Sequence, residues 1–105
     1  MTIVEVTSGI CGFTTRIESS ADASLQVALE ITSDCSRIQE FAERLTEIPA
    51  LEEISQPMTE TQTYRAAAAC RLHAACPVPS AVLKALEVAS GMALPADVHM
   101  TIEQD

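Results

Sequence analysis

The sequence contains no tryptophan, and aromatic residues make up only 3% of its 105 residues. A hydrophobic core must therefore be built from Val, Ile, Leu, Met and Ala, and the apolar fraction of 48% is sufficient for one. Basic residues are also scarce: six Lys and Arg stand against fifteen Asp and Glu, for a formal net charge of −9. Because such an acidic surface repels phosphates and anionic headgroups, we expect neither nucleic acid nor a membrane surface as a partner.

Long apolar runs are missing as well. No stretch approaches the roughly 20 residues that cross a bilayer. The N-terminus opens on Thr2, Ile3 and Val4 without a basic or apolar leader, which favours a cytoplasmic protein. There is no phosphate-cradling glycine loop and no Ser-His-Asp arrangement. A chain of 105 residues is long enough to build its own core, so we expect residues 1–105 to form one domain that needs no disulfide.

Apolar and polar residues alternate in three segments near the N-terminus, at residues 2–7, 13–18 and 25–31. A period of two indicates half-buried strands, and the short connections between them predict an antiparallel meander. A fourth strand is predicted over residues 97–103, where Val98, Met100 and Ile102 alternate with polar residues.

The apolar spacing becomes helical after the third predicted strand. Ile38, Phe41, Leu45 and Ile48 predict a first helix over residues 33–49, and two further helices are predicted over residues 59–72 and 79–91. The resulting order, β-β-β-α-α-α-β, predicts an α+β fold. We expect a two-layer sandwich in which three helices cover one face of a mainly antiparallel four-stranded sheet.

The chemistry of the sequence is concentrated in four cysteines, Cys11, Cys35, Cys70 and Cys76. Cys11 lies in the turn after the first predicted strand, and Cys35 lies where the third strand meets the first helix. In a meander these two positions share one edge of the sheet. A second helix antiparallel to the first returns Cys70 and Cys76 to the same end, so the topology predicts that all four thiols converge.

Thiols stay reduced in the cytoplasm. We therefore expect such cysteines to be metal ligands, reactive groups or core residues in preference to disulfides. Four thiolates at one point repel one another unless a cation is present, which favours an iron-sulfur cluster or, alternatively, zinc. The dipole of the helix that begins beside Cys35 also stabilises the thiolate form of this residue, which is the form that binds metal. No Cys-x-x-Cys pair occurs, which counts against a zinc ribbon.

The segments Gly9-Ile10-Cys11, Asp34-Cys35, Cys70 and Ala75-Cys76-Pro77 form a pattern that resembles two related families. It is similar to the U-type (NifU and IscU type) iron-sulfur cluster scaffold proteins through a Cys-Gly turn and a cysteine at a strand-to-helix junction. It is also similar to the small TSCPD-type cysteine domain, named for its Thr-Ser-Cys-Pro-Asp motif, through a Cys-Pro before a helix. The resemblance implies a ligand role for the four cysteines. The scaffolds carry Asp where this chain has Phe13. Because an all-cysteine site holds a cluster more firmly than one with a carboxylate ligand, the resemblance leaves stable binding as plausible as cluster transfer.

The leading hypothesis is a non-enzymatic iron-sulfur cluster or metal-binding protein that acts as a carrier, scaffold or electron-transfer module. Its expected partners are other proteins of cluster or metal delivery, and a homodimer stays open. Two alternatives also stay open: a structural or protein-interaction domain with buried cysteines and no cofactor, and a thiol-dependent redox protein that uses Cys76 with His73. Five glutamates are interpreted as a solvated face: Glu40, Glu43, Glu47, Glu52 and Glu53.

Overall fold

The computed structural model describes residues 1–105 and has an α+β fold, as the sequence predicts. Its strands are β1 (Thr2–Thr7), β2 (Thr14–Ala21), β3 (Gln26–Ser33) and β4 (Glu47–Pro49). Its helices are α1 (Ser36–Arg44), α2 (Ala50–Ser55), α3 (Gln62–Ala69) and α4 (Val78–Ala89), with single 3-10 turns η1 (Gly9–Cys11) and η2 (Met58–Glu60). No helix has both the length and the apolar character needed to cross a membrane.

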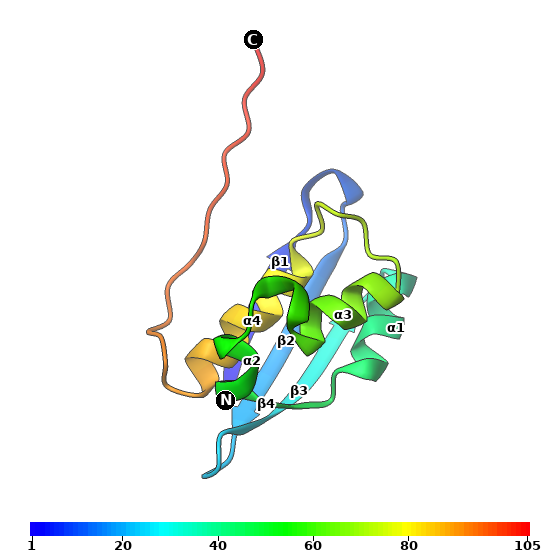
Figure 1. The fold of residues 1–105 in the computed structure, drawn as a ribbon. Helices are drawn as coiled ribbons and strands as arrows, with labels where there is room; N and C mark the ends of the chain where they lie inside the picture. Colours follow the sequence, from blue (N-terminus) through cyan, green and yellow to red (C-terminus); the bar gives the residue numbers. More distant parts are fainter.

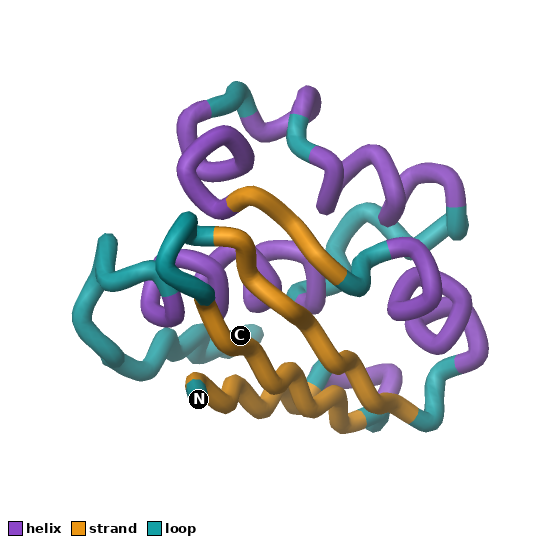
Figure 2. The backbone as a smooth tube through the Cα atoms, turned by 90° about the horizontal axis from the view of Figure 1, so that it is seen from below, coloured by secondary structure: helices purple, strands orange, loops and turns teal.

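The four strands form one antiparallel sheet in the order β1-β2-β3-β4. Val4, Ile17 and Ile31 are aligned across three strands by the pairing register and lie on the face that the helices cover. Figures 1 and 2 show the helices layered on that face alone. The opposite face is polar, and there Arg16 pairs with Glu5 and Glu18 at 3.0 and 3.2 Å. The prediction of helices on one face is confirmed.

The core lies between the sheet and two of the helices. Helix α4 packs across β1 and β2, and α1 packs on β3. The largest fully buried side chains include Phe41, Ile17, Leu45, Ile48 and Leu86. Ser19 of β2 places its hydroxyl 3.4 Å from the carbonyl oxygen of Ala85, which joins β2 to α4. Aliphatic residues thus supply nearly all of the core, as expected for a chain so poor in aromatics.

The first helix is shorter than predicted. It ends at Arg44, and residues 47–49, which were expected to continue it, form β4. Pro49 accounts for the end of this segment, because a proline disfavours the helical conformation of the residue before it, here Ile48. Ile48 is then extended, pairs with Val27 and is fully buried. A spacing of three residues between Leu45 and Ile48 suits a helix, but the proline decides against one.

The strand predicted over residues 97–103 is wrong, because residues 92–105 contain no helix or strand. The chain makes its last backbone hydrogen bond from the Ala93 N–H to the Glu87 carbonyl (3.1 Å), and the tail then runs into solvent (Figure 1). The alternating pattern is present, but a strand forms only when another strand supplies hydrogen-bond partners. The element order is therefore β-β-β-α-β-α-α-α, with four helices in place of three.

The predicted stop of the last helix at Gly91 is confirmed in its physical detail. Gly91 has a left-handed φ of +79°. Its N–H donates to the Val88 carbonyl (3.1 Å), and the Met92 N–H donates to the Glu87 carbonyl (2.8 Å). These bonds form a Schellman motif, for which glycine is the preferred residue because it has no side chain to strain.

Candidate functional site

Cys11 lies in the exposed loop that joins β1 to β2. The Ser8 N–H donates to the Phe13 carbonyl (3.0 Å) and closes the loop, and the Gly12 N–H donates to the Gly9 carbonyl (2.9 Å). Gly12 adopts a left-handed φ of +76°, which lets the chain turn directly after Cys11. The Cys11 thiol lies 3.8 Å from the Ser8 carbonyl oxygen and remains exposed. The loop thus presents this thiol to solvent at the end of the sheet.

Cys35 is the N-cap residue of α1, and buried polar groups fix its position. Its N–H donates to the hydroxyl oxygen of Ser33 (3.2 Å), which also accepts from the buried hydroxyl of Thr15 (3.0 Å). The side-chain amide of Gln39 donates to the Ser33 carbonyl (2.8 Å). The turn from β3 into α1 is therefore held from three sides, and the half-buried thiol sits at the positive end of the helix dipole.

Cys76 immediately precedes α4, whose N-cap is Pro77. Its N–H donates to the His73 carbonyl (3.0 Å), which forms a tight turn over residues 73–76. Burial raises the pKa of the Cys76 thiol, a backbone hydrogen bond from Val78 lowers it, and the charges of Cys11 and Cys35 raise it further. A pKa that rises in this way means that a bare thiolate is disfavoured at this position.

Three of the four predicted site residues lie in segments that the fold brings to one end of the domain: Cys11 in the β1–β2 loop, Cys35 at the start of α1, and Cys76 before α4. Cys11, Cys35 and Cys76 come from three segments that are far apart in sequence, and the charges of the first two act on the third. We call this group the thiol cluster. The β1–β2 loop and the α3–α4 loop lie beside each other at one end of the domain (Figure 1). Two of the three thiols also stand at helix N-termini.

Cys70 has a different environment. It is the C-cap residue of α3, is only 4% exposed and belongs to the hydrophobic core. Arg71 follows it in a left-handed conformation with φ of 57°. The guanidinium of Arg37, near the start of α1, donates to the Arg71 carbonyl (2.7 Å). This contact joins the ends of α1 and α3 close to the thiol cluster, but it leaves the Cys70 side chain inside the core.

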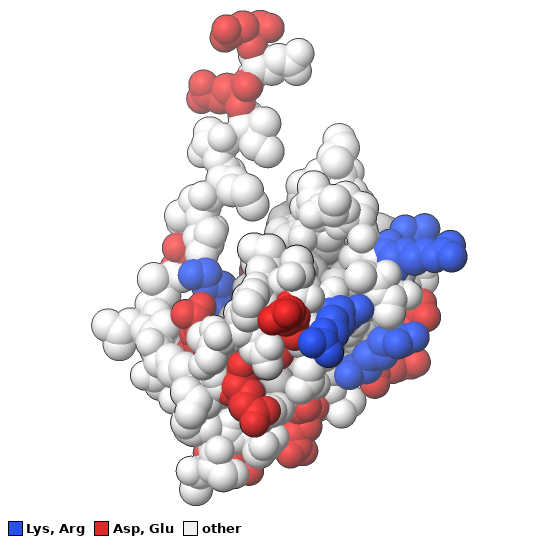
Figure 3. Space-filling view, in the orientation of Figure 1, with Lys and Arg blue, Asp and Glu red and all other residues white.

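Basic residues gather on and beside α1 and α3 in an otherwise acidic protein. Four of the six Lys and Arg residues are exposed on α1 and α3 or directly after α3: Arg37, Arg44, Arg65 and Arg71. Figure 3 shows this concentration of positive charge over the two helices, with scattered acidic residues around it on a surface that is otherwise mostly uncharged. We call these four residues the basic patch. Sequence composition alone does not reveal it, because the four residues become neighbours only when α1 and α3 pack.

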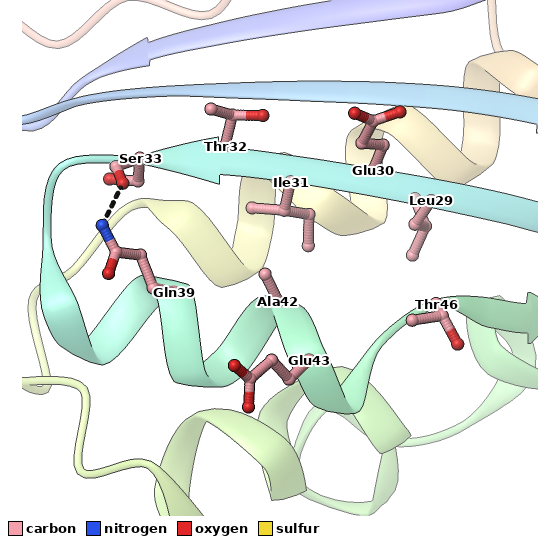
Figure 4. Close-up of a pocket in the computed structure, with 9 residues that line it drawn as sticks. All are labelled: Leu29, Glu30, Ile31, Thr32, Ser33, Gln39, Ala42, Glu43 and Thr46. Atoms are coloured by element: carbon pink, nitrogen blue, oxygen red, sulfur yellow. Dashed lines mark hydrogen bonds between the residues drawn. The ribbon is translucent and has the colours of Figure 1, made fainter.

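A shallow groove of about 440 Å³ lies between the free edge of β3 and α1 (Figure 4). Six of its nine lining residues are polar, among them Glu30, Thr32, Gln39 and Glu43. It contains no cysteine and no histidine, so it is separate from the thiol cluster. The structure contains no group of three or more His, Cys, Asp or Glu side chains placed to hold a metal ion.

One carboxylate has a role that the sequence does not indicate. Glu53 was interpreted as part of a solvated face, and this interpretation is wrong, because Glu53 is 2% exposed. Its oxygens accept from the N–H groups of Gln62 and Thr63 (both 2.8 Å) and from the Thr63 hydroxyl (2.6 Å). Thr61 completes the cap by accepting from the Tyr64 N–H (3.1 Å). Glu53 therefore stabilises the start of α3 and is not a candidate ligand.

Together, these features define a small α+β domain in which three cysteine-bearing segments reach one end of the sheet. A family model described as "Family of unknown function (DUF6951)" matches residues 2–102, and the chain belongs to this family. No curated protein and no solved structure matched the chain.

Proposed function

We propose that this protein binds an iron-sulfur cluster through Cys11, Cys35 and Cys76 and acts as a carrier or scaffold in the cytoplasm. The observation that supports the proposal is that three separate segments carry these cysteines to one end of the domain, where the charges of Cys11 and Cys35 add to burial in raising the pKa of Cys76. Cysteines that only fill a hydrophobic core need not lie near one another, because a buried cysteine packs well wherever a small apolar side chain fits. The resemblance to U-type scaffolds and TSCPD-type domains points to the same residues.

The donor set suits a soft, thiophilic centre. Thiolates are the ligands of iron-sulfur clusters and are also common zinc ligands, so zinc is the alternative occupant. Without a cation, the thiolate charges of Cys11 and Cys35 oppose ionisation of Cys76. A bound metal removes this penalty, because coordination deprotonates a thiol outright.

The surroundings favour an anionic centre. Clusters ligated by several thiolates carry net negative charge, which the N-termini of α1 and α4 offset. The basic patch lies on the same side and adds the positive charge of Arg37 near Cys35. A partner protein that receives or delivers the cluster would meet this patch, so we propose a partner with an acidic docking surface.

Cys70 receives a packing role in this proposal. Its sulfur would reach the thiol cluster only if the end of α3 opened, which would break the hydrogen bonds from Arg71 N–H to Ala68 and from Leu72 N–H to Ala67. Three ligands leave one coordination position of a cluster open to an exogenous ligand or a partner. Such an open position suits a protein that passes its cluster on.

A redox enzyme built on Cys76 and His73 is less well supported. Reactive cysteines depend on a lowered pKa, whereas burial raises that of Cys76. These two residues are joined by a backbone hydrogen bond from the Cys76 N–H to the His73 carbonyl (3.0 Å), which does not involve the imidazole.

The test is anaerobic purification followed by iron, acid-labile sulfide and zinc analysis with an absorption spectrum. We expect iron and sulfide in comparable amounts with thiolate-to-iron charge-transfer bands in the visible region, and we expect their loss in Cys35→Ser. Cys70→Ala is the matched control and should keep its full cluster content. Protein that contains neither iron nor zinc after anaerobic reconstitution would overturn the proposal, as would full occupancy in Cys35→Ser. Loss of the cluster in a folded Cys70→Ala variant would return Cys70 to the ligand set.

A further inference from the structure

The C-terminal tail has the sequence of a strand but no partner in its own chain. Val98, Met100 and Ile102 alternate with polar residues, and these three side chains are 67%, 77% and 91% exposed. Exposed apolar residues in such regular alternation are costly to leave in water and are typical of a strand with one buried face. The tail therefore carries a face that requires a surface to cover it.

The sheet has a matching open edge at β1. This strand pairs only with β2, and the register leaves the N–H and C=O groups of Ile3, Glu5 and Thr7 directed away from the sheet. On its helix-facing side, Val4 and Val6 remain half-buried although they pack against the core. An added strand would supply the missing hydrogen bonds and extend the apolar row that these valines begin.

The other open edge is a poorer acceptor. In β3, the Leu29 N–H is already taken by the Thr46 carbonyl (2.9 Å), and the Ser33 carbonyl accepts from Gln39 (2.8 Å). Only the backbone between these two residues is free, which is too short to pair with a six-residue strand. β1 is open along its six residues.

The direction of the tail indicates that the covering surface belongs to a second molecule. After Ala93 the tail leaves the domain, and the molecule measures 48 Å along its longest axis against 28 and 25 Å along the others. Figure 1 shows the tail separated from the body, and Figure 2 shows β1, which begins at the N-terminus, as the outermost strand of the sheet. The family match spans residues 2–102, which includes both β1 and the alternating residues of the tail.

We propose that two copies of this chain exchange their tails, with residues 98–103 of each copy pairing as a fifth strand beside β1 of the other. The exchange is reciprocal, so it satisfies both open edges and closes the assembly as a symmetric dimer. Val98, Met100 and Ile102 would then face α4 of the partner copy, and the alternate residues His99, Thr101 and Glu103 would face solvent.

Sedimentation velocity of the full chain over a range of concentrations tests the exchange, with a non-thiol reductant present so that disulfide-linked dimers of exposed Cys11 do not form. We expect a reversible dimer. Met100→Asp should raise its dissociation constant about 100-fold or more, because it places a charge in the new core in both copies. Thr101→Asp adds the same charge at a solvent-facing position and should change the constant only severalfold.

A second pair of variants tests the edge strand. Glu5→Pro removes an outward N–H that β2 does not use, so the domain should fold but lose the dimer, since proline is tolerated only on strand edges. Glu5→Ala is the control for the lost carboxylate and should remain dimeric. Thermal melts establish whether each variant is folded. If Glu5→Pro does not fold, the effect of Met100→Asp on the dimer is the deciding result.

Hydrogen exchange separates a tail bound in trans from one bound to its own sheet. Amides of residues 98–102 should be protected above the dimer dissociation constant and unprotected below it. Protection that persists in the monomer would overturn the exchange, as would a chain that stays monomeric at high concentration. A dimer that tolerates both Met100→Asp and a folded Glu5→Pro would overturn it equally.

Discussion

Replacement of Glu53 by alanine gives the sharpest test of the structure. The carboxylate is buried at the N-terminus of α3 and accepts three hydrogen bonds, two from backbone N–H groups and one from the Thr63 hydroxyl. Alanine removes all three and leaves donors at the start of a helix without partners. Loss of a helix cap costs about 1–2 kcal/mol, and a buried donor left unsatisfied adds about 1–3 kcal/mol. We expect Glu53→Ala to lower the free energy of unfolding by about 2–4 kcal/mol.

The assay is urea denaturation followed by far-UV circular dichroism, because the chain has no tryptophan to report by fluorescence. A loss of this size corresponds to a drop in melting temperature of about 10–25 °C in a domain of this length. Glu52→Ala is the matched control, since Glu52 lies in the same first turn of α2 but is exposed. Glu52→Ala should change stability by less than about 0.5 kcal/mol. Equal midpoints for the two variants would refute the assigned cap.

Three further outcomes follow from individual residues. A thiol reagent should modify exposed Cys11 first and buried Cys70 only on unfolding, as peptide mass spectrometry would show; early labelling of Cys70 would contradict its place in the core. Arg71→Gly should raise the free energy of unfolding by up to about 1 kcal/mol in the same urea assay, because φ of 57° strains a residue with a side chain. Hydrogen bonds from Ser24 and Gln26 lower the pKa of Asp22 below its ordinary 3.8, so the stability it contributes is present above pH 3.8 and is lost as the pH falls through the lowered pKa. Asp22→Asn should therefore show a shallower acid limb in melts between about pH 2 and 5, and an unchanged limb would contradict this.

The local patterns of the sequence were sufficient for the sheet face and for the helix stop. Alternation over the first three strands predicts their buried positions, because a half-buried strand requires a period of two. Gly91 and Pro79 predict the bounds of α4 for conformational reasons that hold in any context. These features depend on residues close together in the chain, so no tertiary knowledge is needed.

The features that failed depend on partners distant in the chain. Residues 98–102 have a strand pattern but no strand beside them, and the buried Glu53 is distinguished from the exposed Glu52 only by the arrival of α3 nine residues later. No local pattern of polar residues distinguishes a carboxylate that caps another element from one that faces water. The basic patch is hidden for the same reason.

The four cysteines show how two arguments from one sequence can compete. The topology of a meander with antiparallel helices predicts convergence, and the segments that carry Cys11, Cys35 and Cys76 do reach the same end of the domain. Helical periodicity predicts a different position for the Cys70 side chain. Cys70 follows the buried Ala66 by four residues and the buried Ala67 by three, so it continues the buried side of α3. Topology decides which end of the domain a residue reaches, whereas periodicity decides which way its side chain points. Where the two differ, periodicity governs the side chain, because turning one sulfur outward would require the last turn of α3 to unwind and Cys70 to leave the core.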